Sequence, residues 1–374
     1  MSPDLIILGV SLMVWGVGEA MFLIFQPLYL QQLGANPVTI GVLLGAGGIA
    51  MAVAHIPAGY LADRIGRKPL LLTAWILAML ATWVMAFAPS LPIFVAGMLM
   101  YNLTSFVSSP LNSYITAARG KLSVARAITM VSALYNTGAI LGPWLGGLVS
   151  QRYGLRIIYI IAGSSFIVSS VILFFIRHQP IEVHLTDGSH NSKVFSRQFI
   201  IYQIIILLAG FSMYLAQPLS SNYLQNQQHL SLSSIGLLGT ISSIGIVILN
   251  LGLGSLKPRI GYLLGQVSVS IFALVLWQTA SFPWFCLAYF VLGGYRITRS
   301  LATAQTRYLV PQSRMGLAYG ITETVGTSAI ILASPVAGYL YKIDPSLMYI
   351  VGFSLILISI LISARFIPHP NITV

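Results

Sequence analysis

The sequence predicts an all-α membrane protein of twelve transmembrane helices, arranged as two pseudo-symmetric six-helix bundles. Three observations support this fold class. Hydrophobic residues make up 57% of the 374-residue chain and charged residues only 7%, apolar residues fall into runs long enough to cross a bilayer, and short motifs repeat between the two halves. A soluble domain carries roughly 25% charged residues. Most of this chain is therefore expected to face lipid.

Each predicted span is an apolar run that can cross the membrane as a helix. Crossing about 30 Å of hydrocarbon takes about 20 residues, and a helix satisfies its own backbone polar groups. Six runs precede a polar stretch, near residues 5–30, 40–61, 69–88, 91–115, 125–149 and 156–176. Six more follow it, near residues 198–220, 233–255, 261–279, 283–306, 315–340 and 346–366. Two runs, 69–88 and 261–279, are the shortest, and a merged pair would change the count.

One long polar connection divides the two sets of helices. We expect an N-terminal bundle over 1–176, a cytoplasmic linker over 177–197 and a C-terminal bundle over 198–374. The linker contains three histidines, His178, His184 and His190, but their spacing fits no standard zinc pattern. We interpret it as a solvated linker, and the sequence predicts neither a metal site nor a cofactor.

The basic residues predict the orientation of the chain. A net charge of +12 is compatible with nucleic-acid binding, but these residues lie in short loops between apolar runs, as membrane topology requires. With the N-terminus inside, the cytoplasmic side would hold Arg64, Arg67, Lys68, Arg119, Lys121, Arg177, Lys193, Arg197, Lys257, Arg259, Arg314 and Arg365. The opposite loops would hold only Arg152, Arg156 and Lys342. We therefore expect an inner-membrane protein with both termini cytoplasmic and no nucleic-acid partner.

Two short motifs occur once in each half of the chain. Gly142-Pro143-Trp144-Leu145-Gly146 matches Ser334-Pro335-Val336-Ala337-Gly338, and Arg64-Ile65-Gly66 matches Arg259-Ile260-Gly261. Both matches fall close to the spacing expected for a duplication of six helices. Parallel halves related by an axis along the membrane normal are a known transporter plan. Two such halves could rock about a central site and open it to one side at a time.

The segment from Gly59 to Lys68 reads GYLADRIGRK and resembles the signature loop of the major facilitator superfamily, G-x-x-x-D-R-x-G-R-[KR], between helices two and three. The resemblance implies a twelve-helix transporter whose signature loop locks the cytoplasmic side in the outward-facing state. The implied gate residues are Gly59, Asp63, Arg64, Gly66, Arg67 and Lys68. A carboxylate there would be favoured beside a helix N-terminus. The basic residues could also serve only topology, which gives no reason for Asp63.

A second segment, from Gly138 to Gly147 in helix five, reads GAILGPWLGG. It is similar to the G-x-x-x-G-P-x-x-G-G motif of proton-coupled antiporters in that superfamily. The matching residues are Gly138, Gly142, Pro143, Gly146 and Gly147. Small residues let helices approach closely, so a packing seam is an alternative to an antiport role. Helix four lacks the arginine that drug antiporters usually carry there, which argues against proton coupling by that route.

Two acidic residues lie within predicted spans. An ionisable side chain there costs roughly 2.5–3.5 kcal/mol on insertion scales, so it usually has a partner or a function. Glu19 in helix one is the candidate proton carrier, and an ion pair with Arg296 or Arg299 is the alternative. Glu323 in helix eleven is a second candidate coupling group, or the partner of Arg314 or of a helix-ten arginine.

Polar and aromatic residues mark helices one, four, seven and ten, the helices that line the central cavity in the superfamily. The candidate substrate-binding residues are Trp15, Gln26, Tyr101, Asn102, Asn112, Tyr214, Gln217, Arg296 and Arg299. The two arginines could hold an anionic substrate, because a guanidinium group matches carboxylate and phosphate geometry. They could equally neutralise Glu19 or bond to backbone carbonyls.

These observations predict a secondary active transporter that exports small amphipathic or lipophilic compounds in exchange for protons by alternating access. The alternative is a symporter or uniporter for an anionic small metabolite that uses Arg296 and Arg299. The expected partners are a small-molecule substrate, protons and the lipid bilayer, and the chain is expected to act as a monomer. An enzyme is not expected, because the sequence has no G-x-x-x-x-G-K-[ST] loop and no convergent set of catalytic groups.

Overall fold

The computed structural model describes residues 2–179, 196–253, 256–310 and 315–367, and the side chains of residues 55–65, 125 and 316 lie outside this description. Within these ranges every regular element is a helix. The helices are α1 (Pro3–Leu23), α2 (Gln26–Gln32), α3 (Pro37–Ile65), α4 (Arg67–Phe87), α5 (Leu91–Leu103), the 3-10 helix η1 (Thr104–Val107), α6 (Ser108–Ala118), α7 (Val124–Tyr153), α8 (Arg156–Phe174), α9 (Arg197–Leu215), α10 (Ser220–Asn226), α11 (Leu232–Leu253), α12 (Pro258–Gln278), α13 (Phe282–Leu292), α14 (Gly294–Thr306), α15 (Met315–Ile343) and α16 (Leu347–Phe366).

All twelve predicted apolar runs are helical. Ten helical segments in the described ranges are long and apolar enough to cross a membrane. The two remaining runs are 125–149 and 283–306. The first lies within α7, whose 30 residues include polar positions such as Asn136, and the second is divided into α13 and α14, of 11 and 13 residues.

Four of the predicted spans are interrupted: 5–30 between α1 and α2, 198–220 between α9 and α10, and the runs 91–115 and 283–306. The sequence gives a physical reason for the last two. The run 91–115 changes to a 3-10 turn at Thr104, whose hydroxyl donates to Tyr101 O at 2.7 Å. Pro110 follows, and it lacks the N–H that would continue the helical hydrogen bonds. The run 283–306 breaks at the adjacent pair Gly293 and Gly294, a composition that commonly kinks helices.

The described chain forms two compact units. Unit 1 comprises residues 1–35, 46–185 and 224–240, and unit 2 comprises residues 36–45, 186–223 and 241–374. Most of the predicted linker 177–197 lies outside the described residues. The division into domains 1–176 and 198–374 stays a prediction. The two compact units differ from it at residues 36–45, which belong to unit 2, and at residues 224–240, which belong to unit 1.

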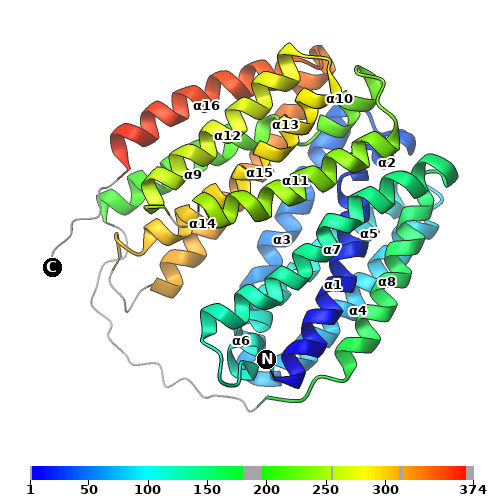
Figure 1. The fold of residues 1–374 in the computed structure, drawn as a ribbon, viewed down its shortest axis with the longest axis vertical. Coiled ribbons are helices and arrows are strands. Elements are labelled where there is room, and N and C mark those ends of the chain that lie inside the picture. Colours follow the sequence, from blue (N-terminus) through cyan, green and yellow to red (C-terminus); the bar gives the residue numbers. More distant parts are fainter. Residues whose placement is uncertain (1, 180–195, 254–255, 311–314, 368–374) are drawn as a thin grey trace. The chain divides into compact units, whose positions relative to one another are not determined.

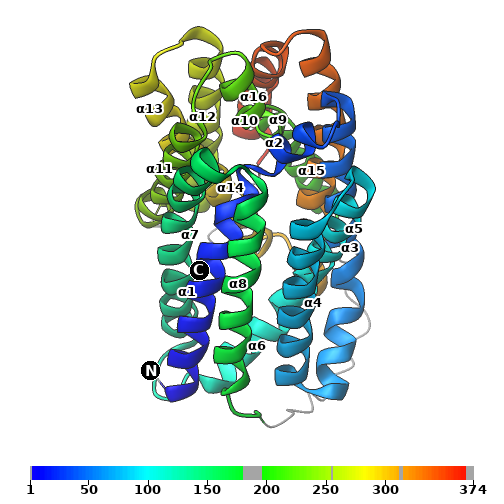
Figure 2. The same ribbon diagram turned by 90° about the vertical axis from the view of Figure 1, so that its right-hand side faces the viewer.

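The two units repeat one pattern of helix pairing. In unit 1, α1 packs against α7 and α8, and α4 packs against α8 and α5; Figure 2 shows α1 alongside α7 and α8. In unit 2, α9 packs against α15 and α16, and α12 packs against α16 and α13; α9, α12 and α16 run together in Figure 1. The pairings correspond helix by helix, as an internal duplication predicts.

Each unit also contains a buried cluster of aromatic rings in a corresponding place. In unit 1 the ring of Tyr159 in α8 lies 5.1 Å from that of Tyr29 and 5.2 Å from that of Phe94. In unit 2 the ring of Tyr349 in α16 lies 4.8 Å from that of Tyr223 and 6.4 Å from that of Phe272. Aromatic pairs at such separations stabilise a core beyond their buried area. Two of the three helices correspond between the clusters, α2 with α10 and α8 with α16, whereas the third is α5 in unit 1 and α12 in unit 2.

Candidate functional site

Glu19 lies in α1 with both carboxylate oxygens hydrogen-bonded to tyrosines. The hydroxyl of Tyr101, from α5, donates to Oε1 at 2.8 Å. The hydroxyl of Tyr135, from α7, donates to Oε2 at 2.7 Å. Hydrogen bonds to an ionised acceptor are shorter and stronger than neutral ones. No Lys, Arg or His of the described residues forms an ion pair with Glu19, so neutral donors hold this carboxylate.

The predicted helix-five motif positions Tyr135. A Cβ atom added to Gly138 would collide with the backbone of α1 at Met13 and Val17, and one added to Gly142 would lie 2.5 Å from Val17 O. At Gly146 the same atom would lie 2.6 Å from Met21 O. The motif therefore brings α7 into backbone contact with α1, as small residues do in membrane helices. This packing places Tyr135, one turn before Gly138, beside Glu19.

Gly147 and Pro143 of the motif make different contacts within unit 1. A Cβ atom added to Gly147 would lie 2.8 Å from Leu232 O of α11. Pro143 lies inside the unbroken helix α7, and its ring would lie 2.8 Å from a Cβ added to Gly239. These two residues thus pack against α11, while the other motif glycines pack against α1.

Aromatic rings surround the Tyr101 side of the carboxylate. The ring of Trp15 lies 4.2 Å from that of Phe166 and 4.7 Å from that of Trp75. The ring of Tyr101 stacks on Phe166 at 6.0 Å with only 13° between the planes. The edge of Phe22 contacts Tyr101 at 5.2 Å. Four helices, α1, α4, α5 and α8, contribute to this cluster, which is buried in unit 1.

A buried hydrogen-bond network fixes the far side of this aromatic cluster. The indole N–H of Trp75 lies 2.9 Å from Ser169 Oγ and 3.2 Å from Ser11 Oγ. The Ser169 hydroxyl in turn donates to Ser11 O at 2.8 Å. Buried polar groups that are fully paired make a packing arrangement specific. The network locks Trp75 against Trp15, and through Trp15 it supports Tyr101.

In unit 2 the predicted arginine and glutamate form an ion pair. Arg299 of α14 donates to Glu323 Oε2 of α15 at 3.0 Å, and the Thr303 hydroxyl donates to Oε1 at 3.0 Å. The side chains are 33% and 57% exposed, respectively. Arg299 also contacts Tyr295, whose ring lies 5.8 Å from that of Tyr214. Of the open alternatives for Glu323, the structure shows the helix-ten arginine as its partner.

The other predicted substrate-binding residues belong to both units. Gln26 is buried in α2, Asn112 and Arg296 are exposed, and Gln217 donates to Met213 O at 2.8 Å. Asn102 donates to Met98 O at 2.8 Å. Within unit 1 the structure brings together Trp15, Tyr101 and Glu19. Within unit 2, Tyr295 contacts Arg299 and lies beside Tyr214.

The predicted cytoplasmic gate is described in part. The side chains of Gly59, Asp63 and Arg64 lie outside the described residues. Gly66, just before α4, has φ of +83°, a left-handed conformation that favours glycine. Lys68 lies over the ring of Phe174 at 5.4 Å, and Arg67 is the first residue of α4. The structure therefore explains the second glycine of the signature loop and leaves the latch untested.

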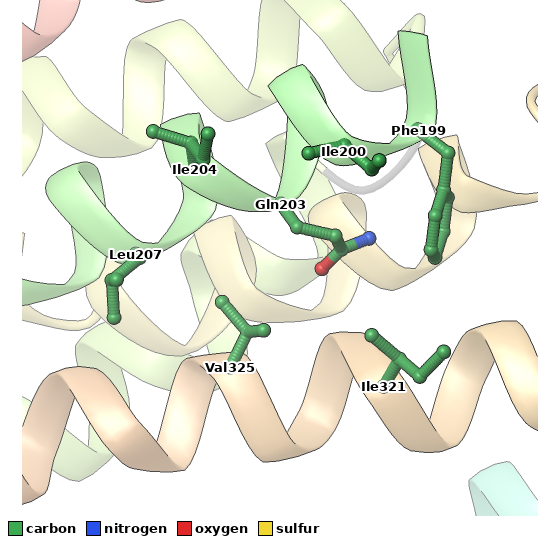
Figure 3. A pocket seen from close by; sticks show the side chains of 7 residues that line it. All are labelled: Phe199, Ile200, Gln203, Ile204, Leu207, Ile321 and Val325. Atoms are coloured by element: carbon green, nitrogen blue, oxygen red, sulfur yellow. The ribbon is translucent and has the colours of Figure 1, made fainter. Parts of the chain in front are cut away.

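A separate hollow of about 260 Å³ lies between α9 and α15. It is lined by Phe199, Ile200, Gln203, Ile204, Leu207, Ile321 and Val325, and Figure 3 shows the Gln203 amide among these apolar side chains. The Gln203 amide donates to the hydroxyl of Thr322 at 3.0 Å. The hollow offers apolar surface, and its polar group is turned to the neighbouring helix.

Sequence reasoning missed two residues of the Glu19 site, Tyr135 and Trp75. Tyr135 stood out in the sequence only as one of many aromatic residues, and Trp75 carried no signal of its own. A signal for Tyr135 was present, because it lies three residues before Gly138 and so adjoins the face that the motif glycines define. The motif predicts that α7 touches another helix. It does not predict which residue of α1 lies opposite Tyr135, so the hydrogen bond with Glu19 is seen only in the structure.

Repeated units of apolar helices that hold an ionisable group inside the membrane define a polytopic membrane carrier. The family model described as Major Facilitator Superfamily matches residues 8–213 and 203–373. The chain belongs to this superfamily and is a transport protein rather than an enzyme. The predicted fold class and the resemblance carried by the signature loop are therefore confirmed.

Relatives and solved structures agree with this assignment. An uncharacterized MFS-type transporter of Methanocaldococcus jannaschii is 23% identical over 84% of this chain and 85% of that protein. Multidrug resistance protein MdtG of Proteus mirabilis is 25% identical over 87% of this chain and 83% of that protein. A crystal structure of a variant of the nucleoside transporter NupG shares the fold with a TM-score of 0.81, at 13% identity, over 97% of this chain and 98% of that chain.

Proposed function

We propose that this transporter exports small amphipathic or lipophilic compounds in exchange for protons, with Glu19 as the proton carrier. One observation carries the proposal: a carboxylate inside the membrane is held by two neutral phenols, Tyr101 and Tyr135. Such a group can change its charge without leaving a partner charge uncompensated. The aromatic cluster around Trp15 offers apolar surface beside it. The name of the relative MdtG, a multidrug resistance protein, supports the same substrate class.

The test is transport in proteoliposomes under an imposed pH gradient, with ethidium, a lipophilic cation, as the probe. Glu19→Gln keeps the size of the side chain but cannot exchange a proton. We expect the variant to lose gradient-driven ethidium transport. Asp344→Asn, which makes the same chemical change at the residue after α15, is the matched control and should transport as the wild type does. Undiminished gradient-driven transport by Glu19→Gln would remove Glu19 from the coupling role.

A second candidate function is uptake of an anionic small metabolite. It is favoured by Arg299, which is partly exposed and lies beside Tyr295 in unit 2. An incoming carboxylate could replace Glu323 as the partner of its guanidinium group. Benzoate in place of ethidium distinguishes the two functions in the same vesicles. Gradient-driven benzoate transport that depends on Arg299 and survives Glu19→Gln would favour the second candidate.

We also propose that both termini are cytoplasmic in the inner membrane, that the chain acts as a monomer, and that Asp63 and its basic neighbours close the cytoplasmic side. The distribution of lysine and arginine among the loops supports the orientation. Single cysteines at Lys121 and Lys342, in a chain with Cys286→Ser, test it with a membrane-impermeant maleimide. We expect labelling of intact cells at position 342 and labelling at position 121 only after lysis. The reverse pattern would refute the orientation.

A further inference from the structure

The two tyrosines that bind Glu19 lie in different surroundings. Tyr101 is only 7% exposed. Its ring is stacked on Phe166 at 6.0 Å and on Trp15 at 6.5 Å, and it meets the ring of Phe22 at a steep angle. The hydroxyl of Tyr101 is therefore held in one position, directed at Oε1 of Glu19.

Tyr135 is half-buried and lies at the border of two faces of α7. On one side is Gly138, which packs on α1. On the other are Ser132, which is exposed, and Asn136, whose amide donates to Ser132 Oγ at 3.3 Å. Polar side chains of membrane helices usually face water or protein rather than lipid. Water can therefore approach the hydrogen bond between Tyr135 and Oε2.

We propose that Tyr101 is the fixed donor that stabilises the charged form of Glu19, and that Tyr135 is an exchangeable donor that yields Oε2 to the proton. This proposal rests on the function proposed above. A hydronium ion on the Tyr135 side transfers its proton to Oε2: an O–H bond forms on the carboxylate, and the hydronium O–H bond breaks to leave water. The Tyr135 hydroxyl turns its hydrogen away and accepts from the new acid. Tyr101 keeps donating to Oε1 throughout.

No other titratable group of the described residues competes for this role. On α7 the charged side chains, Arg126 and Arg152, lie near the two ends of the helix. On α8, Arg156 is the first residue and donates to Ala86 O, and Tyr159 packs against Phe22. The described part of α5 contributes only Tyr101. The two oxygens of Glu19 therefore differ mainly in their donors: Tyr101 is buried and Tyr135 is half-buried.

The test measures protonation of Glu19 by infrared difference spectroscopy of the reconstituted protein as a function of pH. The carboxylic-acid signal is assigned by its loss in Glu19→Gln. Tyr101→Phe removes a donor that nothing can replace, so the midpoint should rise by roughly one to two pH units. Tyr135→Phe removes a donor that water can replace, so the midpoint should rise by less than about half a pH unit. Tyr153→Phe, an exposed tyrosine of α7, is the matched control and should leave it unchanged.

A second variant covers the case in which Tyr101→Phe does not fold. Trp15→Phe keeps an aromatic ring but removes part of the surface that packs on Tyr101, so it should loosen this donor and raise the midpoint by a smaller amount in the same direction. Equal shifts in Tyr101→Phe and Tyr135→Phe, or a larger shift in the second, overturn the division between the phenols. If the wild type shows no acid signal that Glu19→Gln removes, the proton-carrier function itself is overturned. The two failures are therefore distinguishable.

Discussion

Units 1 and 2 each hold a carboxylate on a membrane-spanning helix, but they partner it in opposite ways. Glu19 in unit 1 receives two phenol hydrogen bonds at 2.7 and 2.8 Å. Glu323 in unit 2 forms an ion pair with Arg299 and accepts from Thr303, both at 3.0 Å. The two similar units thus hold their carboxylates differently: α1 carries one bound by neutral phenols, and α15 carries one paired with an arginine.

The difference indicates which carboxylate is suited to proton exchange. Protonation of Glu323 would leave the Arg299 guanidinium without its counter-charge, although the cost is modest because both side chains are partly exposed. Protonation of Glu19 leaves no such charge behind, because phenols are neutral donors that can also accept. Both groups remain candidates for coupling, but the physical argument favours Glu19 as the proton carrier and Glu323 as a fixed partner.

The largest effect is expected where α7 meets α1, because this contact creates the Glu19 site. Gly142→Ala would place a Cβ atom 2.5 Å from Val17 O and 2.9 Å from Met21 N, both backbone atoms. We expect a loss of about 1–3 kcal/mol in the free energy of unfolding, because the helices must separate. Thermal unfolding in detergent measures it, and the protonation midpoint of Glu19 should rise slightly in parallel as the Tyr135 donor moves away.

Gly320→Ala is the matched control in unit 2. This glycine lies in α15, and a Cβ atom there would meet nothing within 4 Å. Alanine is the better helix former by about 1 kcal/mol, so the control should keep or raise stability. An equal response of the two variants would show that the helix-five motif does not depend on close contact with α1.

The sequence was sufficient to predict the twelve helical runs and the repeat, and to single out Glu19 as a candidate. Hydrophobicity over about 20 residues is a strong local signal, and a carboxyl group inside such a run is rare enough to stand out. The close packing of Gly138 and Gly142 on another helix was also among the readings of the motif. Each of these features follows from a short segment of sequence, so it can be predicted without the tertiary structure.

The partners of the charged groups required the structure. Glu19 was expected to bind a helix-ten arginine if it was paired at all, yet its donors come from α5 and α7. Tyr135 reaches Glu19 only because of the register between α7 and α1, which no single-sequence pattern specifies. The helix breaks at Thr104 and Gly293 likewise depend on how the chain packs around Pro110 and the Gly293–Gly294 pair. Mean hydropathy over a window of about 20 residues does not detect such breaks.

The smallest effect on stability is expected at the ion pair of unit 2, and it gives the sharpest functional contrast. Arg299 and Glu323 are 33% and 57% exposed, so solvent screens their attraction, and the pair contributes about 0–1 kcal/mol. Glu323→Gln should therefore change the unfolding temperature little. It should also retain gradient-driven ethidium transport, because the amide oxygen can still accept from Arg299 while the amide N–H donates to the Thr303 hydroxyl.

A double-mutant cycle with Arg299→Gln measures the coupling between the two side chains directly. We expect the two stability changes to be nearly additive, with a coupling below about 1 kcal/mol. Transport under a pH gradient is the second readout, with Glu19→Gln measured beside it. If Glu323→Gln abolishes gradient-driven transport as completely as Glu19→Gln, both carboxylates carry coupling protons. The contrast between a phenol-held and an arginine-held carboxylate would then no longer explain how the protein uses the proton gradient.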